Sequence, residues 1–331
     1  MKKPLVSAPA RIGAVGMYVP SRVLTNADFE KMFDTSDEWI VQRTGIRTRH
    51  VVGEGEYTSH LAIGAVDDLL AKNPSVRLAD IDYIIVASST PDYSYPSVAA
   101  MLQHHYGLPT TVGAIDITAA CAGFAYAINL ACGVIASGEA DRALVIAADA
   151  LTRSADYTDR STAILFGDGG GAAIVERSDE PRILGMSHGA DGGGGKFLYR
   201  TGIRSDINGI VDESRLLRQS GRDVYRWVLE NTPGFVGRIL ERAGLALEDV
   251  DWFVPHSANL RMIEALNKRL DFPMERTLLS VCDYGNTSAV SIPLALIPAL
   301  RDGRVKPGQR VLTMGFGGGL VMAGQVLLVQ P

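Results

Sequence analysis

The sequence of 331 residues has few cysteines and no large excess of charge of either sign. Its three cysteines cannot all pair within one chain and show no spacing typical of a metal site, so neither a disulfide framework nor a zinc site is expected. So few thiols are typical of a protein of the reducing cytoplasm. A formal net charge of −5 argues against general binding of nucleic acid, which usually requires a strongly basic domain.

We also expect no stretch of the chain to be long and apolar enough to span a bilayer. The apolar run at the N-terminus is far too short for a signal peptide, and Arg11 directly follows the one candidate cleavage sequence. These absences predict a cytoplasmic protein without membrane insertion. With 47% hydrophobic residues, the chain is nevertheless long enough to bury a sizeable core.

The two halves of the sequence repeat one pattern about 168 residues apart. Residues 78–86 and 247–254 each join a helix end, an acidic turn and an apolar strand. Residues 136–146 and 300–312 each close a helix, turn through glycine and enter a strand. A repeat of this length indicates duplicated domains rather than a solenoid.

Helical patterns alternate with short β-branched runs in each half, which predicts α/β units with mainly parallel strands. We therefore expect an α/β fold of two similar halves, residues 1–178 and 179–331, related by a pseudo-two-fold axis. The division falls near residues 176–181. Residues 185–218 are rich in glycine and poorly patterned, so we expect an irregular excursion there.

One cysteine stands at a predicted strand-to-helix junction. Residues 112–117 predict a buried strand, and Cys121 opens an alanine-rich helical segment that ends near Gly138. Unpaired backbone N–H groups and the positive end of the helix dipole would meet there and favour a thiolate. Cys121 is therefore a candidate nucleophile. The alternative is a buried structural cysteine, a frequent state of free cysteine.

The duplication predicts partners for this thiol. The region that corresponds to Cys121 in the second half is the helix start at residues 285–289, which contains Asn286, and the strand that ends at Val254 continues to His256. Ligands of α/β sheets bind beyond the carboxyl ends of strands, where all three side chains would fall. Considered alone, the histidine would be interpreted as a loop residue with its hydrogen bonds satisfied, and the asparagine as a helix cap. The glycine clusters lack the spacing of a nucleotide-binding loop.

Several motifs carry a resemblance to a known family. Its enzymes have the following segments in this order and spacing: Ala120-Cys121-Ala-Gly-Phe, Pro255-His256-Ser-Ala-Asn259-Leu-Arg261, Gly285-Asn286-Thr-Ser and Gly315-Phe-Gly-Gly-Gly319, together with residues 34–46, 159–160 and 166–169. Over nearly its whole length the sequence resembles β-ketoacyl-acyl-carrier-protein synthase III. The resemblance implies a thiolase-like fold with five layers, αβαβα, and a cytoplasmic acyltransferase that starts fatty-acid biosynthesis without a cofactor or metal. Its Cys-His-Asn set differs from the Cys-His-His set of the elongating synthases.

The resemblance also implies a reaction. Cys121 would attack the thioester of an acyl-CoA primer, while the backbone N–H groups of Cys121 and Gly318 bind the oxyanion. Malonyl-acyl-carrier protein (malonyl-ACP) would then lose CO₂, and His256 and Asn286 would donate hydrogen bonds to the enolate. The carbanion would attack the acyl-cysteine and release β-ketoacyl-ACP.

Two binding surfaces follow from the same resemblance. The residues implied for CoA and substrate are Trp39, Arg43, Arg160 and Phe316, with the indole stacked on adenine. A basic helix face after the histidine suits an acidic carrier protein. The implied carrier contacts are Ser257, Ala258, Asn259, Leu260, Arg261, Lys268 and Arg269, with Arg226 as an addition.

The sequence departs from the family at positions that bear on specificity. Ser257 stands where glutamine is more usual, and Tyr95 stands where phenylalanine is common. In the related enzymes the loop around Tyr95 crosses a homodimer interface to the floor of the acyl pocket, so acetyl, straight-chain and branched primers all stay open. Three other functions stay open as well: a specialised ketosynthase or acyltransferase of secondary metabolism, a Cys-His-Asn hydrolase or amidase, and a non-enzymatic scaffold.

Overall fold

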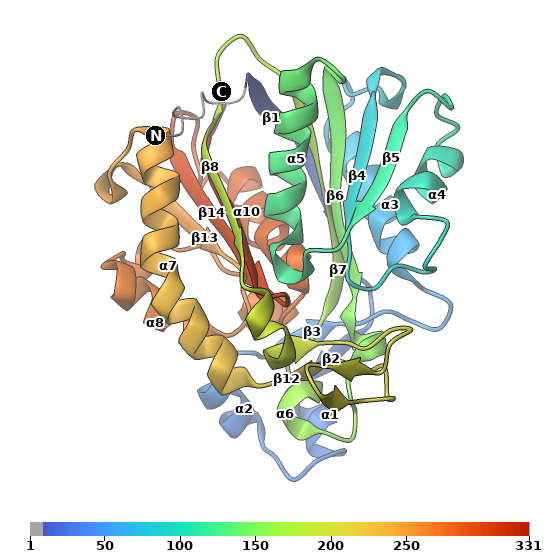
Figure 1. Cartoon of the computed structure of the whole chain (residues 1–331), viewed down its shortest axis with the longest axis vertical. Helices are drawn as coiled ribbons and strands as arrows, with labels where there is room; N and C mark the ends of the chain where they lie inside the picture. Colours follow the sequence, from blue (N-terminus) through green and yellow to red (C-terminus); the bar gives the residue numbers. More distant parts are fainter. Residues whose placement is uncertain (1–8, 331) are drawn as a thin grey trace.

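The computed structural model describes residues 9–330, in which two sheets of the same design lie face to face (Figure 1). The first sheet has the order β1 (Ala10–Tyr18), β7 (Asp168–Arg177), β6 (Arg142–Ala150), β4 (Tyr83–Ala87) and β5 (Gly113–Ile117). The second has the order β8 (Ile183–Ala190), β15 (Val321–Leu328), β14 (Arg310–Gly317) and β13 (Trp252–Pro255). The connection between β7 and β8 contains the predicted division at residues 178 and 179.

Helices form three layers around these sheets, which gives the expected five-layered α/β architecture. The helices are α3 (Thr58–Lys72), α4 (Val98–His105), α5 (Gly123–Ser137), α7 (Gly221–Ala243), α8 (Leu260–Leu270) and α10 (Ser291–Arg301). The central pair, α5 and α10, packs against both sheets. On the outer faces, α3 and α4 cover the first sheet, while α7 covers the second with α8 packed beside it.

Shorter elements gather at one end of the sheets, at the bottom of Figure 1. They are α1 (Asn26–Glu30), α2 (Asp37–Thr44), α6 (Arg160–Ala163), α9 (Val281–Tyr284), β2 (Val23–Thr25), β3 (Thr48–His50), β9 (Leu198–Tyr199), β10 (Asp206–Ile207), β11 (Ile210–Val211) and β12 (Arg218–Gln219). The 3₁₀ turn Ala120–Ala122 leads into α5, and the turn Ser288–Val290 leads into α10. Both turns begin with a left-handed residue, Ala120 at φ 43° and Ser288 at φ 54°. The structural counterpart of Cys121 is therefore Ala289, three residues after Asn286.

Three expectations about strands were wrong. The sheets are mixed rather than mainly parallel, because β7, β1, β15 and β8 run antiparallel to their neighbours. An apolar run indicates that a strand is buried on both faces, and both parallel and antiparallel strands can be buried in this way. The irregular excursion expected over residues 185–218 begins only at residue 191, because residues 185–190 belong to β8. Gly185 in this strand leaves room for α7: a Cβ there would lie 2.3 Å from the Ile239 carbonyl oxygen. The strand β5 is an exposed edge rather than buried, with Ile115 44% exposed.

One apolar stretch contradicts the expectation that no segment is long and apolar enough to span a bilayer. Residues Ala120–Ser137 have a mean hydropathy of 1.6 over 18 residues. In the fold this stretch is the turn before α5 and α5 itself, which packs between the two sheets. A central helix that contacts a sheet on each side needs apolar residues around most of its surface, which accounts for the composition.

Candidate active site

Cys121 lies where the first half packs closely on the backbone of the second. A Cβ added to Gly317 in β14 would lie 2.7 Å from the backbone nitrogen and 3.1 Å from Sγ of Cys121. A Cβ on Gly315 would lie 2.6 Å from the Ala122 Cα. The interpretation of the second glycine cluster as close backbone packing around the cysteine is thus confirmed. Gly318 follows directly, and a Cβ there would meet the Ala120 side chain at 3.5 Å.

His256 directly follows β13 and is only 2% exposed. Its Nδ1 lies 2.7 Å from Oγ of Ser291, which opens α10. The ring of Phe316 meets the imidazole edge-to-face, with ring centroids 5.1 Å apart. These two contacts orient the imidazole. Phe316 is buried in the second half, so the structure places it against the histidine rather than on an outer surface.

The side-chain amide of Asn286 is held in place through its oxygen. Its Oδ1 accepts a hydrogen bond from the Ser288 N–H at 3.0 Å. Its own backbone is fixed on both sides, by Leu165 O at 2.8 Å and by Gly167 N at 3.0 Å. Within residues 9–330 the Nδ2 group has no hydrogen-bond partner, so it is available as a donor.

Ser288 is the point where the three candidate residues meet. Its side chain lowers the pKa of the Cys121 thiol, its backbone raises the pKa of His256, and its N–H donates to Asn286 Oδ1 at 3.0 Å. The structure thus brings together the three residues that the sequence singled out. Ser288 itself was not predicted. A signal existed, because the repeat aligns it with Ala120, and both residues adopt the left-handed conformation that non-glycine residues rarely take.

Burial decides the protonation of this site. It raises the pKa of the Cys121 thiol to about 12, a rise that the Ser288 contact opposes and the nearby Asp149 charge increases. Burial also lowers the pKa of His256 to about 3. Both shifts favour the neutral forms at pH 7, which opposes the thiolate expected from the helix N-terminus. The thiol proton must move when the sulfur attacks, and the neutral imidazole is able to accept it.

Two of the expected CoA residues form a surface stack. Trp39 lies on α2, 37% exposed, and Ser36 caps that helix by accepting the Trp39 N–H at 3.1 Å. The Arg160 guanidinium lies 4.6 Å from the centroid of the indole ring. Arg43 is exposed on the same helix. The expectation that Trp39 sits on a surface element is confirmed.

The expected carrier contacts divide into buried and exposed residues. Ser257 is fully buried: its Oγ accepts from Ser280 N at 3.0 Å and its N–H donates to Ser291 at 3.2 Å. It cannot touch a carrier protein, so that expectation was wrong. Ala258 is half-buried, and the Asn259 side chain caps α8 by accepting the Arg261 N–H at 2.8 Å.

The remaining expected carrier contacts, Leu260 and the basic residues after it, differ in how many interactions they already form within the chain. Leu260 packs against Gly45, whose Cβ would lie 2.5 Å from the leucine Cβ. Arg261 donates to Gln42 O at 2.9 Å and pairs with Glu264 at 3.0 Å. Lys268 and Arg269 are exposed in the last turn of α8 and form no ion pair within the described residues. The suggested addition, Arg226, is exposed on α7.

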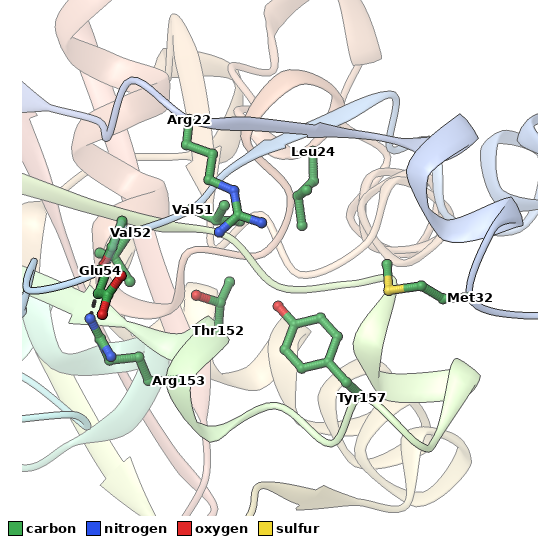
Figure 2. A pocket seen from close by; sticks show the side chains of 10 residues that line it. Arg22, Leu24, Met32, Val51, Val52, Glu54, Thr152, Arg153 and Tyr157 are labelled. Atoms are coloured by element: carbon green, nitrogen blue, oxygen red, sulfur yellow. Dashed lines mark hydrogen bonds between the residues drawn. The ribbon is translucent and has the colours of Figure 1, made fainter.

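A separate cavity of about 410 Å³ lies beside these surface elements (Figure 2). Its lining comes from β2, from residues 51–54 and from residues 152–157, with Met32 at one end. The guanidinium of Arg22 and the hydroxyl of Tyr157 point toward each other across it. None of the three candidate catalytic residues contributes to the lining, so this cavity is distinct from the site around Ser288.

Comparisons with known proteins agree on one family. The family descriptions that match are "3-Oxoacyl-[acyl-carrier-protein (ACP)] synthase III" over residues 115–192 and its C-terminal counterpart over residues 240–329. The chain is 50% identical over 321 residues to beta-ketoacyl-acyl-carrier-protein synthase III 2 of Bacillus subtilis (strain 168), covering 96% of this chain and 98% of the relative.

Solved structures show the same likeness. The synthase III of Thermus thermophilus superposes with a TM-score of 0.92 at 45% identity, covering 96% of this chain and 98% of the other. The priming β-ketosynthase of the R1128 polyketide biosynthetic pathway superposes with a TM-score of 0.90 at 35% identity, covering 100% and 98%.

Proposed function

The chain belongs to the β-ketoacyl-acyl-carrier-protein synthase III family, and we propose that it condenses an acyl-CoA primer with malonyl-ACP. The products are β-ketoacyl-ACP, CO₂ and CoA, and the reaction initiates fatty-acid biosynthesis. The observation that carries this proposal is the convergence of Cys121, His256 and Asn286 on Ser288. The set joins a nucleophile to one proton acceptor and one fixed amide donor.

The first half-reaction transfers the acyl group to the cysteine. The Cys121 thiol gives its proton to neutral His256 as the sulfur attacks the thioester carbonyl carbon. We assign binding of the oxyanion to the backbone N–H groups of Cys121 and Gly318. Backbone donors of this kind stabilise an oxyanion without changing their own protonation. Collapse of the intermediate breaks the bond to the CoA sulfur, and the departing thiolate takes the proton back from His256.

The second half-reaction uses the same residues as hydrogen-bond donors. Loss of CO₂ from malonyl-ACP leaves an enolate whose oxygen needs donors, and His256 and the free Nδ2 of Asn286 supply them. The carbanion attacks the acyl-Cys121 carbonyl, forms the new carbon–carbon bond and expels the Cys121 thiolate. That thiolate then takes a proton from solvent, and the resting thiol is restored.

The position of the asparagine argues against a hydrolase. In Cys-His-Asn proteases the third residue orients the histidine. Here Ser291 holds the His256 Nδ1, and the Asn286 amide oxygen is occupied by the Ser288 N–H. The asparagine is therefore placed for a substrate oxygen and not for the imidazole.

An assay with a panel of primers tests the proposed function and decides the primer. Purified protein is mixed with acetyl-CoA, straight-chain and branched acyl-CoAs, and malonyl-ACP, and the carrier product is identified by mass spectrometry. A β-ketoacyl-ACP product supports the proposal. Hydrolysis of the acyl-CoA alone would support the hydrolase, and no reaction with any primer would support a scaffold.

The polyketide-priming enzyme shares the chemistry, but the fatty-acid synthase relatives are more similar, at 50% identity against 35%.

The stack on α2 supports the proposed CoA site. An exposed indole with a guanidinium on its ring offers a flat, cationic platform for adenine and phosphate. We assign the nucleotide end of CoA to Trp39, Arg160 and the nearby Arg43. Phe316 acts instead through its contact with His256.

We assign carrier recognition to the end of α8, and charge reversal there is expected to weaken it. The double variant Lys268→Glu with Arg269→Glu should raise KM for malonyl-ACP about tenfold, because repulsion replaces attraction to an acidic partner. KM for the acyl-CoA should not change. The control is Lys72→Glu with Lys306→Glu, which alters net charge equally at exposed positions elsewhere. Equal KM values for malonyl-ACP in both double variants would contradict this assignment.

A homodimer in the cytoplasm completes the proposal. Strand β5 is an open edge, and apolar side chains are exposed on it and beside it: Ile115 at 44%, Leu130 at 46%, Tyr93 at 59% and Tyr95 at 86%. A second copy that pairs along β5 would satisfy the edge and cover these side chains. Light scattering should give twice the chain mass of 35.5 kDa, and the monomer mass at micromolar concentration would contradict the dimer. Three free cysteines accord with a reducing compartment.

A further inference from the structure

Arg49, on β3, is a fully buried arginine. Within the described part of the chain no carboxylate lies at ion-pair distance from it. Its Nε donates to the Ile164 carbonyl oxygen at 2.9 Å, its Nη2 donates to the same oxygen, and its Nη1 donates to Asn26 Oδ1 at 2.6 Å. The guanidinium also lies 4.6 Å from the centroid of the Phe29 ring.

Burying this charge is costly, so its position needs a reason. Burial lowers the pKa of Arg49 to about 10, which still leaves the group charged at neutral pH. A buried charge without an ion partner destabilises a fold unless its hydrogen bonds achieve something that an apolar side chain cannot. The planar guanidinium spreads its donors over three nitrogens in a rigid fork and so spans two acceptors on different sides, whereas the three donors of lysine share one nitrogen.

Both acceptors lead to the elements of the Trp39–Arg160 stack. Ile164 ends α6, whose first residue is Arg160. Asn26 uses its Nδ2 to hold the two ends of α2: Asp37 Oδ1 at 2.7 Å at the start and Ile46 O at 2.8 Å just after the end. The helix between these points carries Trp39. Arg49 is therefore a polar link between α6 and α2 through the protein interior, beside the apolar packing of Ile40 on Ala163 and Ile164.

We propose that Arg49 is a positioning residue that sets the spacing of α2 and α6 and so aligns Trp39 with Arg160 for the nucleotide end of CoA. This proposal rests on the proposed function for the identity of the ligand. It assigns a specificity role to a residue that no substrate touches. The stack itself, at 4.6 Å between guanidinium and ring centroid, is the geometry that Arg49 maintains.

The test compares two primers that share an acyl group and differ in the nucleotide. One is the acyl-CoA, and the other is the same acyl group on N-acetylcysteamine, which reaches Cys121 without touching the stack. The variants are Arg49→Lys, which keeps the charge but not the fork, and Asn26→Ala, which releases α2 and removes one of the two acceptors of Arg49 while leaving its bonds to Ile164. In each variant KM for acyl-CoA should rise about tenfold or more, with kcat/KM for the truncated thioester within about twofold of wild type.

Asn26→Ala guards against a second effect of Arg49. The Leu165 carbonyl, next to Ile164, holds the Asn286 backbone, so a change at Arg49 could also reach the catalytic amide. Asn26 does not contact that segment. The control variant is Arg47→Lys. Arg47 lies two residues before Arg49, is exposed and pairs with Asp283, so this change should leave the kinetic constants for both primers unaffected. A separate measurement of melting temperature identifies any loss of folded protein.

Equal losses for both primers in both variants would overturn the proposal, because Arg49 would then serve the fold alone. An unchanged KM for acyl-CoA would overturn it as well. Failure of the proposed function looks different: wild-type protein would then react with neither primer or would not favour acyl-CoA over the truncated thioester.

Discussion

The Asn286→Asp variant is expected to form the acyl-enzyme at close to the wild-type rate and to lose about 10³-fold in condensation. The two side chains have the same shape, and an aspartate can still accept the Ser288 N–H that holds the residue in place. The substitution replaces a donor that faces the substrate with a negatively charged acceptor. An enolate oxygen beside that carboxylate would be repelled rather than stabilised, whereas the acylation step does not use the amide.

The measurement separates the half-reactions. Acylation is followed by intact-protein mass in single turnover, and decarboxylation by release of labelled CO₂ from malonyl-ACP. Asn231→Asp, an exposed asparagine on α7, is the matched control and should affect neither step. The assigned role of Asn286 is wrong if acylation and decarboxylation fall by the same factor.

The His256→Ala variant is expected to change how the reactivity of Cys121 depends on pH. With the thiol pKa raised to about 12 and the His256 pKa lowered to about 3, the resting pair is neutral between these values. The reactive arrangement, thiolate with imidazolium, carries the same total number of protons. Alkylation of the wild-type cysteine should therefore be nearly independent of pH from about 6 to 9.

Without the imidazole, only solvent can take the proton. The thiolate fraction then rises with pH below the thiol pKa, so alkylation of the His256→Ala variant should increase about tenfold per pH unit over the same range. At pH 7 the variant should react at least about 100-fold more slowly than wild type, within the usual range for loss of a general base. The rate is measured with iodoacetamide, with the modified peptide identified as the one that contains Cys121. Parallel pH profiles for the two proteins would contradict proton transfer to His256.

The sequence was informative where the chemistry depends on local context. The strand-to-helix junction at Cys121 and the histidine after an apolar strand could both be recognised, because each depends on neighbours in the chain. The duplication then placed Asn286 near them. Strand direction was less accessible, since a run buried on both faces looks the same whether parallel or antiparallel. Strand β8 escaped notice because two glycines interrupt its apolar pattern, and one of them, Gly185, makes room for α7.

The errors at the site have one physical cause. The protonation of Cys121 and the burial of Ser257 depend on how the two halves enclose these residues, and a sequence does not display that enclosure. The dipole of a helix N-terminus favours a thiolate by a modest amount, whereas desolvation of the thiol opposes it more strongly. Ser291 and Arg49 act through contacts between segments far apart in the chain, so no local pattern indicates them.

The central claim is that Cys121 carries the acyl group into a condensation. The most direct measurement is intact-protein and peptide mass spectrometry in two stages, first with an acyl-CoA alone and then after addition of malonyl-ACP. We predict an adduct of the acyl mass on the Cys121 peptide, which disappears on addition of malonyl-ACP as an equal amount of β-ketoacyl-ACP forms. An adduct on another residue, or one lost only by hydrolysis with no carrier product, would contradict the claim.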